Sequence, residues 1–218
     1  MRPRDWLLWG GSVGAIVLSC ICFPGTDPRT VSAALIGVSS LIMAAKGHPL
    51  AHVLAILFAA LYGWVSFDFR YYGEMLTYLC MTAPMAAVSL WTWIKNPNGA
   101  GTVAVRAHLT RRLRLGLIFG TAAATAGFGV LLWRLGTAQL PVSILSVTTS
   151  FAAAYLTACR SPFYALAYAA NDIVLLVLWV LAAFGDRSCV PMVTCFACFL
   201  LSDCYGFLSW RKMAKNEK

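Results

Sequence analysis

The strongest constraint on the fold is a succession of apolar stretches that each contain few charged residues. Their lengths lie close to the ~20 residues with which a helix crosses the hydrocarbon core of a bilayer. Charged residues, Gly and Pro separate the stretches. We therefore expect an all-α membrane protein with eight spans, at residues 6–23, 30–45, 50–67, 74–94, 112–133, 138–158, 162–184 and 189–210.

Composition and charge agree with this class. Charged residues make up 11% of the chain, against about 25% in a soluble domain, so little of the chain lies outside the bilayer. A net charge of +9 would suggest nucleic acid in a soluble protein. Here the basic residues lie in short loops, where they mark the cytoplasmic side, and we exclude a nucleic-acid partner.

The distribution of Lys and Arg also predicts the orientation. With the N-terminus inside, 13 of the 17 basic residues fall on the inner side, and the four outside are Arg29, Arg70, Arg134 and Arg187. Both termini are therefore expected in the cytoplasm.

No motif of an enzyme or of a metal site is present. The chain lacks H-E-x-x-H, G-x-S-x-G and a Walker A motif, so we expect no catalytic residue and no ATP-driven transport by this chain alone. Cys195 and Cys198 form a C-x-x-C inside an apolar span without a second pair or a nearby His. They are best explained as small buried hydrophobic residues, and we expect no metal or other cofactor.

The stretch 160–184 carries the residues most easily explained by binding. Asn171 and Asp172 lie side by side near its middle, where an ionisable residue is costly and usually faces a cavity or the bundle interior. Trp179 follows Asn171 by eight positions and should lie near the same face. The two polar residues point about 100° apart and should not both face one spot. An amide, a carboxylate and an indole suit a small polar solute that contains a ring.

A second acid lies deep in the last span. Asp203, followed closely by Tyr205, is the only acid besides Asp172 at such depth, whereas Asp68 and Glu74 lie near loop ends, where a solvated charge is expected. Each deep polar residue has a structural alternative, which is an interhelical hydrogen bond that holds the bundle together.

Aromatic rings within the spans are candidates for stacking on a solute. Trp179 is the first choice because of its depth. Trp93 and Trp210 lie beside cations at span ends and are assigned to the interfacial belts. Thr149, in a row of mid-span hydroxyls, is a further candidate, although such hydroxyls often bond carbonyls of their own helix. The other aromatic candidates are Tyr62, Trp64, Tyr164, Tyr168 and Tyr205.

Weak internal similarity divides the chain into two three-helix units. The matching positions, at offsets of 114, 115 and 117, are Lys46 with Arg160, Trp64 with Trp179 and Trp93 with Trp210. The charge count gives both units one orientation, so an odd number of spans must separate them. The predicted segments are an N-terminal helix and loop (1–29), a first repeat (30–95), a cytoplasmic linker and connecting helix (96–137), a second repeat (138–213) and a cytoplasmic tail (214–218). Parallel three-helix repeats around a midplane site are the architecture of SWEET-like transporters.

Several motifs, in this order, resemble the PnuC family of vitamin-precursor transporters. They are GVSSLIMAAKG, YGEMLTYLCMTAPM and WTW in the first unit, then SVTTSFAAAYL, NDIVLLVLW and SDCYGFLSWRKM in the second. The similarity runs from about residue 30 to 213. It implies a full-length SWEET-like 3+1+3 core, here with one extra N-terminal helix, and facilitated diffusion of nicotinamide riboside. It also implies a homotrimer in a bacterial plasma membrane and a cytoplasmic kinase that traps the substrate by phosphorylation.

The resemblance implies distinct roles for the candidate residues. Asn171 would both donate to and accept from the carboxamide in one plane. A buried carboxylate such as Asp172 would stabilise the cationic pyridinium, Asp203 would bond the ribose hydroxyls, and the aromatic rings would stack.

The chain departs from the family pattern at positions that bear on the substrate. Many members place two Trp three residues apart just before the Asn of the sixth core helix, where this chain has Tyr164 and Ala167, with Tyr168 next. Phe58 stands in place of a common Asn, and Ser143 in place of a common acid. Thiamine, riboflavin and a deoxynucleoside are therefore alternative solutes, and a membrane assembly subunit is the alternative without transport.

Overall fold

The computed structural model describes residues 3–23, 25, 27–98, 101–137 and 139–216. Within this part of the chain, eight helical segments are long and apolar enough to cross a membrane, which confirms the predicted number. Residues 1–2 and 217–218, from the predicted N-terminal and tail segments, lie outside the description. The helices are α1 (Pro3–Cys22), α2 (Pro28–Ala45), α3 (Leu50–Asp68), α4 (Tyr72–Leu76), η1 (Thr77–Thr82), α5 (Ala83–Lys95), α6 (Arg111–Arg134), α7 (Leu140–Ala158), α8 (Tyr164–Gly185), η2 (Arg187–Cys189) and α9 (Val190–Asn216).

Local sequence signals fix several of the helix starts. Asp27 caps α2 by accepting a 2.7 Å hydrogen bond from the Arg29 backbone N–H, and Pro28 supplies a first helical residue that needs no donor. Thr110 caps α6 in the same way through Leu113. These caps place each helix start within a few residues of the apolar run that predicted it.

The fourth span, 72–95, contains a π-helical segment. Its middle part, Thr77–Thr82, has the wider π turn and leads directly into α5, which has Pro84 in its first turn. Pro84 cannot donate a backbone hydrogen bond, so regular α-helical bonding is interrupted just where the π turn ends.

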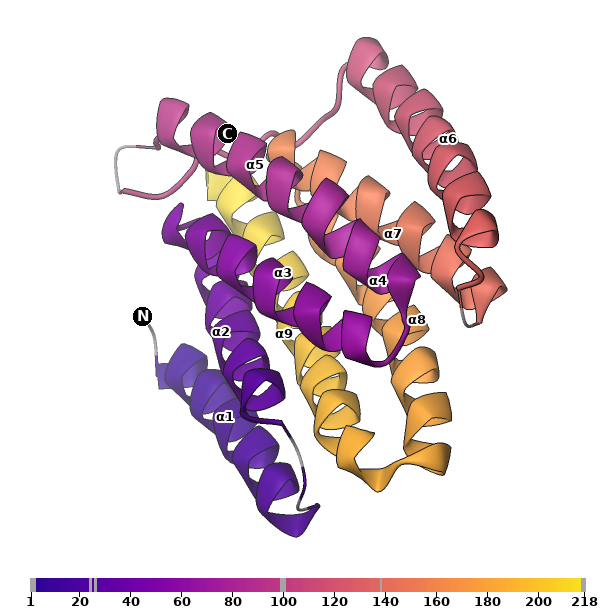
Figure 1. Ribbon diagram of the computed structural model, residues 1–218. Coiled ribbons are helices and arrows are strands. Elements are labelled where there is room, and N and C mark those ends of the chain that lie inside the picture. The colour runs from indigo at the N-terminus through magenta and orange to yellow at the C-terminus, as the bar shows by residue number, and fades with distance from the viewer. Residues whose placement is uncertain (1–2, 24, 26, 99–100, 138, 217–218) are drawn as a thin grey trace.

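Six spans form a closed ring (Figure 1). In order around the ring they are α2, α3, the α4–α5 span, α7, α8 and α9, which packs back against α2. The helix α1 lies outside this ring against α2 and α9. The helix α6 lies on another side, packed mainly against α7, and much of its surface is exposed.

Two tryptophans tie the two halves of the ring together at one end. Trp93 of α5 donates a 3.1 Å hydrogen bond to the carbonyl of Thr157 in α7, and Trp210 of α9 donates a 2.8 Å hydrogen bond to the carbonyl of Ala44 in α2. Their ring centroids are 5.2 Å apart. Both indoles are buried, so the predicted place for them in an interfacial belt is wrong. The prediction was based on a neighbouring cation in the sequence, which carries no information about the carbonyl group that each indole bonds.

The linker after α5 crosses the same end of the ring. The backbone N–H of Val103 donates to the carbonyl of Gly47, and that of Arg106 donates to the carbonyl of Arg160, both at 2.9 Å. Gly47 has φ +70, a conformation that favours glycine, and Val103 is fully buried above it. The linker therefore joins the α2–α3 turn to the α7–α8 turn.

Two glycines in the ring give a matched stability test. A Cβ at Gly37 would lie 2.2 Å from Cζ of Phe199, whereas a Cβ at Gly206 would meet nothing closer than 3.5 Å. We expect Gly37→Ala to lower the free energy of unfolding by about 1–3 kcal/mol through overpacking. Gly206→Ala should be neutral or stabilising by up to about 1 kcal/mol, because Ala favours the helix. Thermal unfolding in detergent measures both, and equal effects would contradict the close packing at Gly37.

Candidate functional site

A central cavity of about 80 Å³ lies inside the ring, and each of the six ring spans contributes to its wall. The volume is below the ~300 Å³ at which ligand pockets usually begin, so a larger solute needs the surrounding rings to move. Its polar lining residues are Ser40, His52, Tyr78, Thr82, Ser89, Thr157, Tyr164, Tyr168, Asn171, Asp172 and Asp203.

Two carboxyl groups give the cavity its electrostatic character. Asp172 of α8 and Asp203 of α9 are each only 3% exposed, and Oδ2 of Asp172 has no hydrogen-bond partner among the described residues. None of the described residues that line the cavity is Lys or Arg. Buried carboxylates without a counter-ion are costly in a low-dielectric interior, so this cavity favours a positively charged guest.

Asn171 is held by a row of hydroxyl groups on α7. Its Oδ1 accepts hydrogen bonds from Thr149 at 2.8 Å, Ser150 at 3.0 Å and Ser146 at 3.3 Å. The amide oxygen is therefore engaged, and the amide nitrogen is the group that can bond a ligand. Simultaneous donation to and acceptance from one carboxamide, as expected from the sequence, does not fit this arrangement.

The structure places both neighbours, Asn171 and Asp172, on the cavity wall. The expectation that they could not face one spot is therefore too strict. The ~100° between them still holds, but two side chains that point in different directions can both line a cavity that six spans enclose.

Glu74 is a further buried acid beside Asp172 and Asp203, and the sequence assigned it wrongly. It is fully buried on α4, where its Oε2 lies 3.2 Å from the Ser146 hydroxyl, whose single hydrogen can go to Glu74 or to Asn171. Its Oε1 has no partner among the described residues. Ser146 thus lies between Glu74 and Asn171. Thr77 and Tyr78, at the i+3 and i+4 positions that share its helical face, are buried with it, but their burial could not be read from the sequence.

Aromatic rings form part of the cavity wall. Tyr164 and Tyr168 of α8 both line it, as predicted candidates, with their ring centroids 6.2 Å apart in an edge-to-face arrangement. Phe58, Tyr78 and Phe199 line it as well and were not predicted. A cationic ring can be stabilised by such faces in addition to the carboxyl groups.

Trp179 and Tyr62 lie outside the cavity wall. Both are fully buried, and Nε1 of Trp179 donates a 2.8 Å hydrogen bond to the Tyr62 hydroxyl. Tyr62 also packs against the rings of Phe58 and Tyr78 at 5.4 and 4.5 Å. These rings form an aromatic layer beside the central cavity.

Beyond the aromatic layer lies a second cavity of about 190 Å³, whose wall includes Trp179, Asp27 and Asp68. Arg29 pairs with both acids, and its hydrogen bonds hold the pKa of Asp27 below the usual range. The aromatic layer thus separates this second cavity from the central one.

Three other predicted residues are placed away from the cavity. Trp64 is 57% exposed on the outer surface, with the Arg29 guanidinium 4.8 Å from its ring centroid. Tyr205 bonds Lys46 at 2.9 Å and contacts Asp5 of α1, outside the ring. Thr149 supports Asn171 from behind.

Trp179 can be tested as a structural residue. Trp179→Phe keeps the ring packing but removes the hydrogen bond to Tyr62, so we expect a loss of about 1–3 kcal/mol in unfolding free energy. We expect the affinity for a solute bound in the central cavity to change less than about twofold, because Trp179 does not line that cavity. Trp133→Phe, at a 69% exposed position of α6, is the control. A tenfold loss of affinity measured by calorimetry would contradict a purely structural role and would indicate that Trp179 contacts the solute.

Comparison with known proteins identifies related sequences along nearly the whole chain. Residues 27–212 match the family model described as nicotinamide mononucleotide transporter. Two relatives are each named nicotinamide riboside transporter PnuC. The protein of Neisseria mucosa is 27% identical over 218 residues, covering 97% of this chain and 81% of the relative. The protein of Haemophilus influenzae is 24% identical over 183 residues, covering 83% and 77%.

One solved structure shares the fold. The crystal structure described as that of the vitamin B3 transporter PnuC superposes with a TM-score of 0.86 at 23% sequence identity. The match covers all of this chain and 94% of the other.

Proposed function

The chain belongs to the nicotinamide mononucleotide transporter family, and from this we propose that it carries nicotinamide riboside across a bacterial plasma membrane by facilitated diffusion. The names of the family and of the two relatives disagree on the solute, since the family is named for the mononucleotide and both relatives for the riboside. The chemistry of the cavity helps to decide between them.

The charge of the central cavity is the observation that carries the choice. A mononucleotide adds a phosphate with a charge of about −1.5 to −2 at pH 7, which would need Lys or Arg nearby. The described lining offers Asp172 and Asp203 and no such cation. The riboside carries a single positive charge on its pyridinium ring, which two carboxyl groups can neutralise. The cavity therefore supports the riboside.

The binding residues we propose are those on the cavity wall. Asp172 and Asp203 face the positive charge and the ribose hydroxyls, and the amide nitrogen of Asn171 donates to the carboxamide oxygen. Tyr164 and Tyr168 offer ring faces in place of indoles. Support of the cavity wall through packing and hydrogen bonds is the role we propose for Trp179, Tyr62 and Thr149, which do not line the cavity.

The mechanism we propose uses two three-helix units, 30–95 and 138–213, that rock about the central site. The reciprocal bonds of Trp93 and Trp210 support a repeat, because each indole reaches the end of the first helix in the other unit. The linker and α6 connect the units. Both termini face the cytoplasm in this proposal, as the charge distribution predicts.

Metabolism gives the direction in this proposal. A cytoplasmic kinase phosphorylates the riboside and keeps its internal concentration low, so net uptake continues without an ion gradient. The homotrimer implied by the family resemblance is part of the same proposal.

Uptake into proteoliposomes tests the function. Because the riboside is a cation, the membrane potential is clamped at zero with equal potassium and valinomycin on both sides. We expect the internal riboside concentration to rise to the external one and stop. With the kinase and ATP inside, the total internal label should rise further, as phosphorylated riboside. Accumulation driven by an imposed proton or sodium gradient would contradict facilitated diffusion. Empty liposomes are the control.

Calorimetry against a panel of solutes tests the identity of the substrate. We expect the riboside to bind more tightly than thiamine, riboflavin or a deoxynucleoside, because it combines a single cationic ring with a carboxamide. Preferred binding of another member would keep the transporter and change the solute. Binding of none would favour a membrane assembly subunit.

A further inference from the structure

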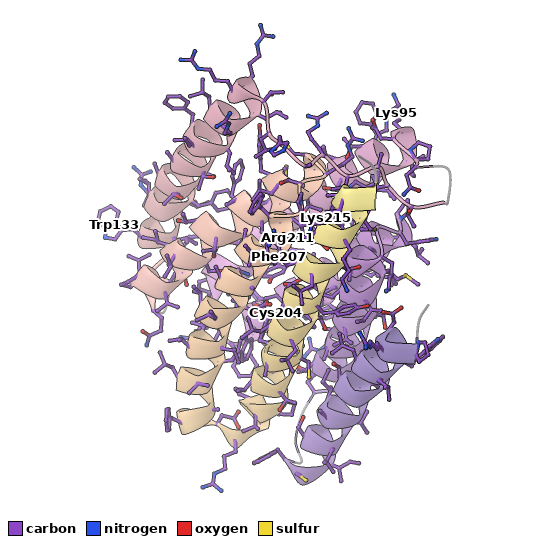
Figure 2. All side chains as sticks on the ribbon, turned by 180° about the vertical axis from the view of Figure 1, so that it is seen from behind. Lys95, Trp133, Cys204, Phe207, Arg211 and Lys215 are labelled. Atoms are coloured by element: carbon purple, nitrogen blue, oxygen red, sulfur yellow. The ribbon has the colours of Figure 1, made fainter. Side chains whose placement is uncertain are left out.

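A groove of about 1070 Å³ lies outside the ring, at the end where α1 begins and α9 finishes. One wall comes from the first residues of α1, including Arg4 and Leu8, and the other from the last turns of α9, including Leu208, Lys212 and Lys215. Figure 2 shows Lys215 at the end of α9, far from Trp133 on α6. The groove shares no lining residue with the central cavity.

A buried ion pair holds the two walls together. Asp5 of α1 is fully buried and lies 2.6 Å from the Lys46 ammonium at the end of α2, and the Tyr205 hydroxyl of α9 donates to the same carboxylate. Partial burial opposes the charge of Lys46, but its bonds to Asp5 and Tyr205 raise its pKa above the ordinary value. Contacts among Asp5, Lys46 and Tyr205 therefore join three helices at the groove. The charges of Asp5 and Lys46 cancel, so this pair adds no net charge.

Among the described residues that line the groove, the remaining charges are all positive. Arg4, Lys212 and Lys215 are exposed on its walls. Of the lining residues that the structure describes, Asp5 is the one acid, and Lys46 neutralises it. This arrangement leaves an excess of three cations facing the groove, and it therefore favours an anionic occupant.

Polarity changes with depth along the groove. The basic side chains lie at the helix ends, whereas Leu8 and Leu208 lie about one turn deeper, roughly 6 Å further along each helix. Leu208 is 59% exposed toward the surroundings of the bundle. A phospholipid has the same order of parts, with a phosphate at the surface and apolar chains beneath it.

We propose that this groove binds the headgroup of an anionic phospholipid, with Arg4, Lys212 and Lys215 contacting its phosphate and Leu8 and Leu208 its glycerol and upper acyl chain. The proposal gives α1, which lies outside the ring, a specific task as one wall of a lipid site. A free phosphate compound could use the same cations, but it would leave the apolar floor of the groove without a partner.

Native mass spectrometry of the delipidated protein in detergent tests the site. The probes are phosphatidylglycerol and phosphatidylcholine with identical acyl chains. We expect wild-type protein to retain phosphatidylglycerol at concentrations at least about tenfold lower than phosphatidylcholine, since each basic residue near an anionic headgroup favours binding. The triple variant Arg4→Gln/Lys212→Gln/Lys215→Gln should lose this preference.

A matched variant separates a site from general charge attraction. Arg111→Gln/Arg112→Gln/Arg114→Gln removes the same three charges from the exposed start of α6, which contacts neither α1 nor α9 among the described residues. We expect it to keep the preference within about twofold. Equal losses in both triple variants, or no preference in wild-type protein, would overturn the proposal. Displacement of phosphatidylglycerol by millimolar inorganic phosphate would indicate a free-anion site and would also overturn it.

Folding of the variants is checked independently. All proteins should show the same thermal unfolding temperature in detergent and the same riboside affinity, because the groove and the cavity share no residues. If the triple variant unfolds, Lys212→Gln/Lys215→Gln leaves α1 intact, and it should still weaken the preference by at least about threefold. Retention of the full preference in that folded double variant would contradict the proposal.

Discussion

Replacing both cavity carboxyl groups, as Asp172→Asn/Asp203→Asn, should weaken binding of the cationic riboside by at least roughly a hundredfold. A unit charge at about 4 Å contributes roughly 4 kcal/mol at an effective dielectric of ~20, and tenfold in affinity is about 1.4 kcal/mol. The described lining contains no other acid that could compensate. Titration calorimetry in detergent measures the change.

Two comparisons isolate charge from shape in this experiment. The affinity of the double variant for the uncharged dihydropyridine form of the same riboside should be less than about tenfold below that of wild type. This ligand has no positive charge for the carboxyl groups to stabilise. The double variant should also be as stable as wild type or more so, because two buried carboxyl groups with no Lys or Arg among the described lining residues oppose folding. Equal losses for the charged and uncharged ligands would mean that the carboxyl groups act through shape or hydrogen bonds, and the electrostatic argument for the riboside would fail.

Asn171→Ala should lower both riboside affinity and stability. Removing the amide takes away the donor proposed for the carboxamide, for which we expect a loss of roughly tenfold to a hundredfold. It also leaves the hydroxyl of Ser150 without its acceptor and removes one from Ser146 and Thr149, at a cost of about 1–3 kcal/mol in unfolding free energy. Calorimetry and thermal unfolding report the two effects separately.

Thr148→Ala is the control for Asn171→Ala. Thr148 belongs to the same hydroxyl row of α7 but lies 2.9 Å from the Thr125 hydroxyl of α6 and does not line the cavity. We expect its riboside affinity to stay within about twofold of wild type. A stable Asn171→Ala variant with full affinity would remove Asn171 from the site and would favour the assembly-subunit alternative.

The sequence predicted the spans well because apolar length depends only on local composition. It predicted the wall of the central cavity less well because periodicity gives the direction of a side chain and not its depth. Trp179 does face inward like Asn171, but eight residues place it roughly 12 Å further along the helix, in the aromatic layer. Glu74 shows the same limit, because its position near a loop did not reveal that its side chain is buried.

Residues two positions apart explain the other departures. Tyr62 is buried while Trp64 faces outward, and Asp203 lines the cavity while Tyr205 contacts α1. Two residues correspond to roughly 200° around a helix, so one member of each pair had to point away from the centre. The partners that each outward residue found, Arg29 and Asp5, lie on other helices and could not be read from local pattern.

The reciprocal tryptophan bonds have a consequence for how the protein opens. Trp93 and Trp210 each hold a carbonyl of the opposite half, and their rings touch at the centre of that end. Separation of the halves there must break both bonds together, because neither indole can follow one half without releasing the other. Opening at that end should therefore be cooperative, with two states and few intermediates. The coupling between the two indoles would set the free energy that opening requires.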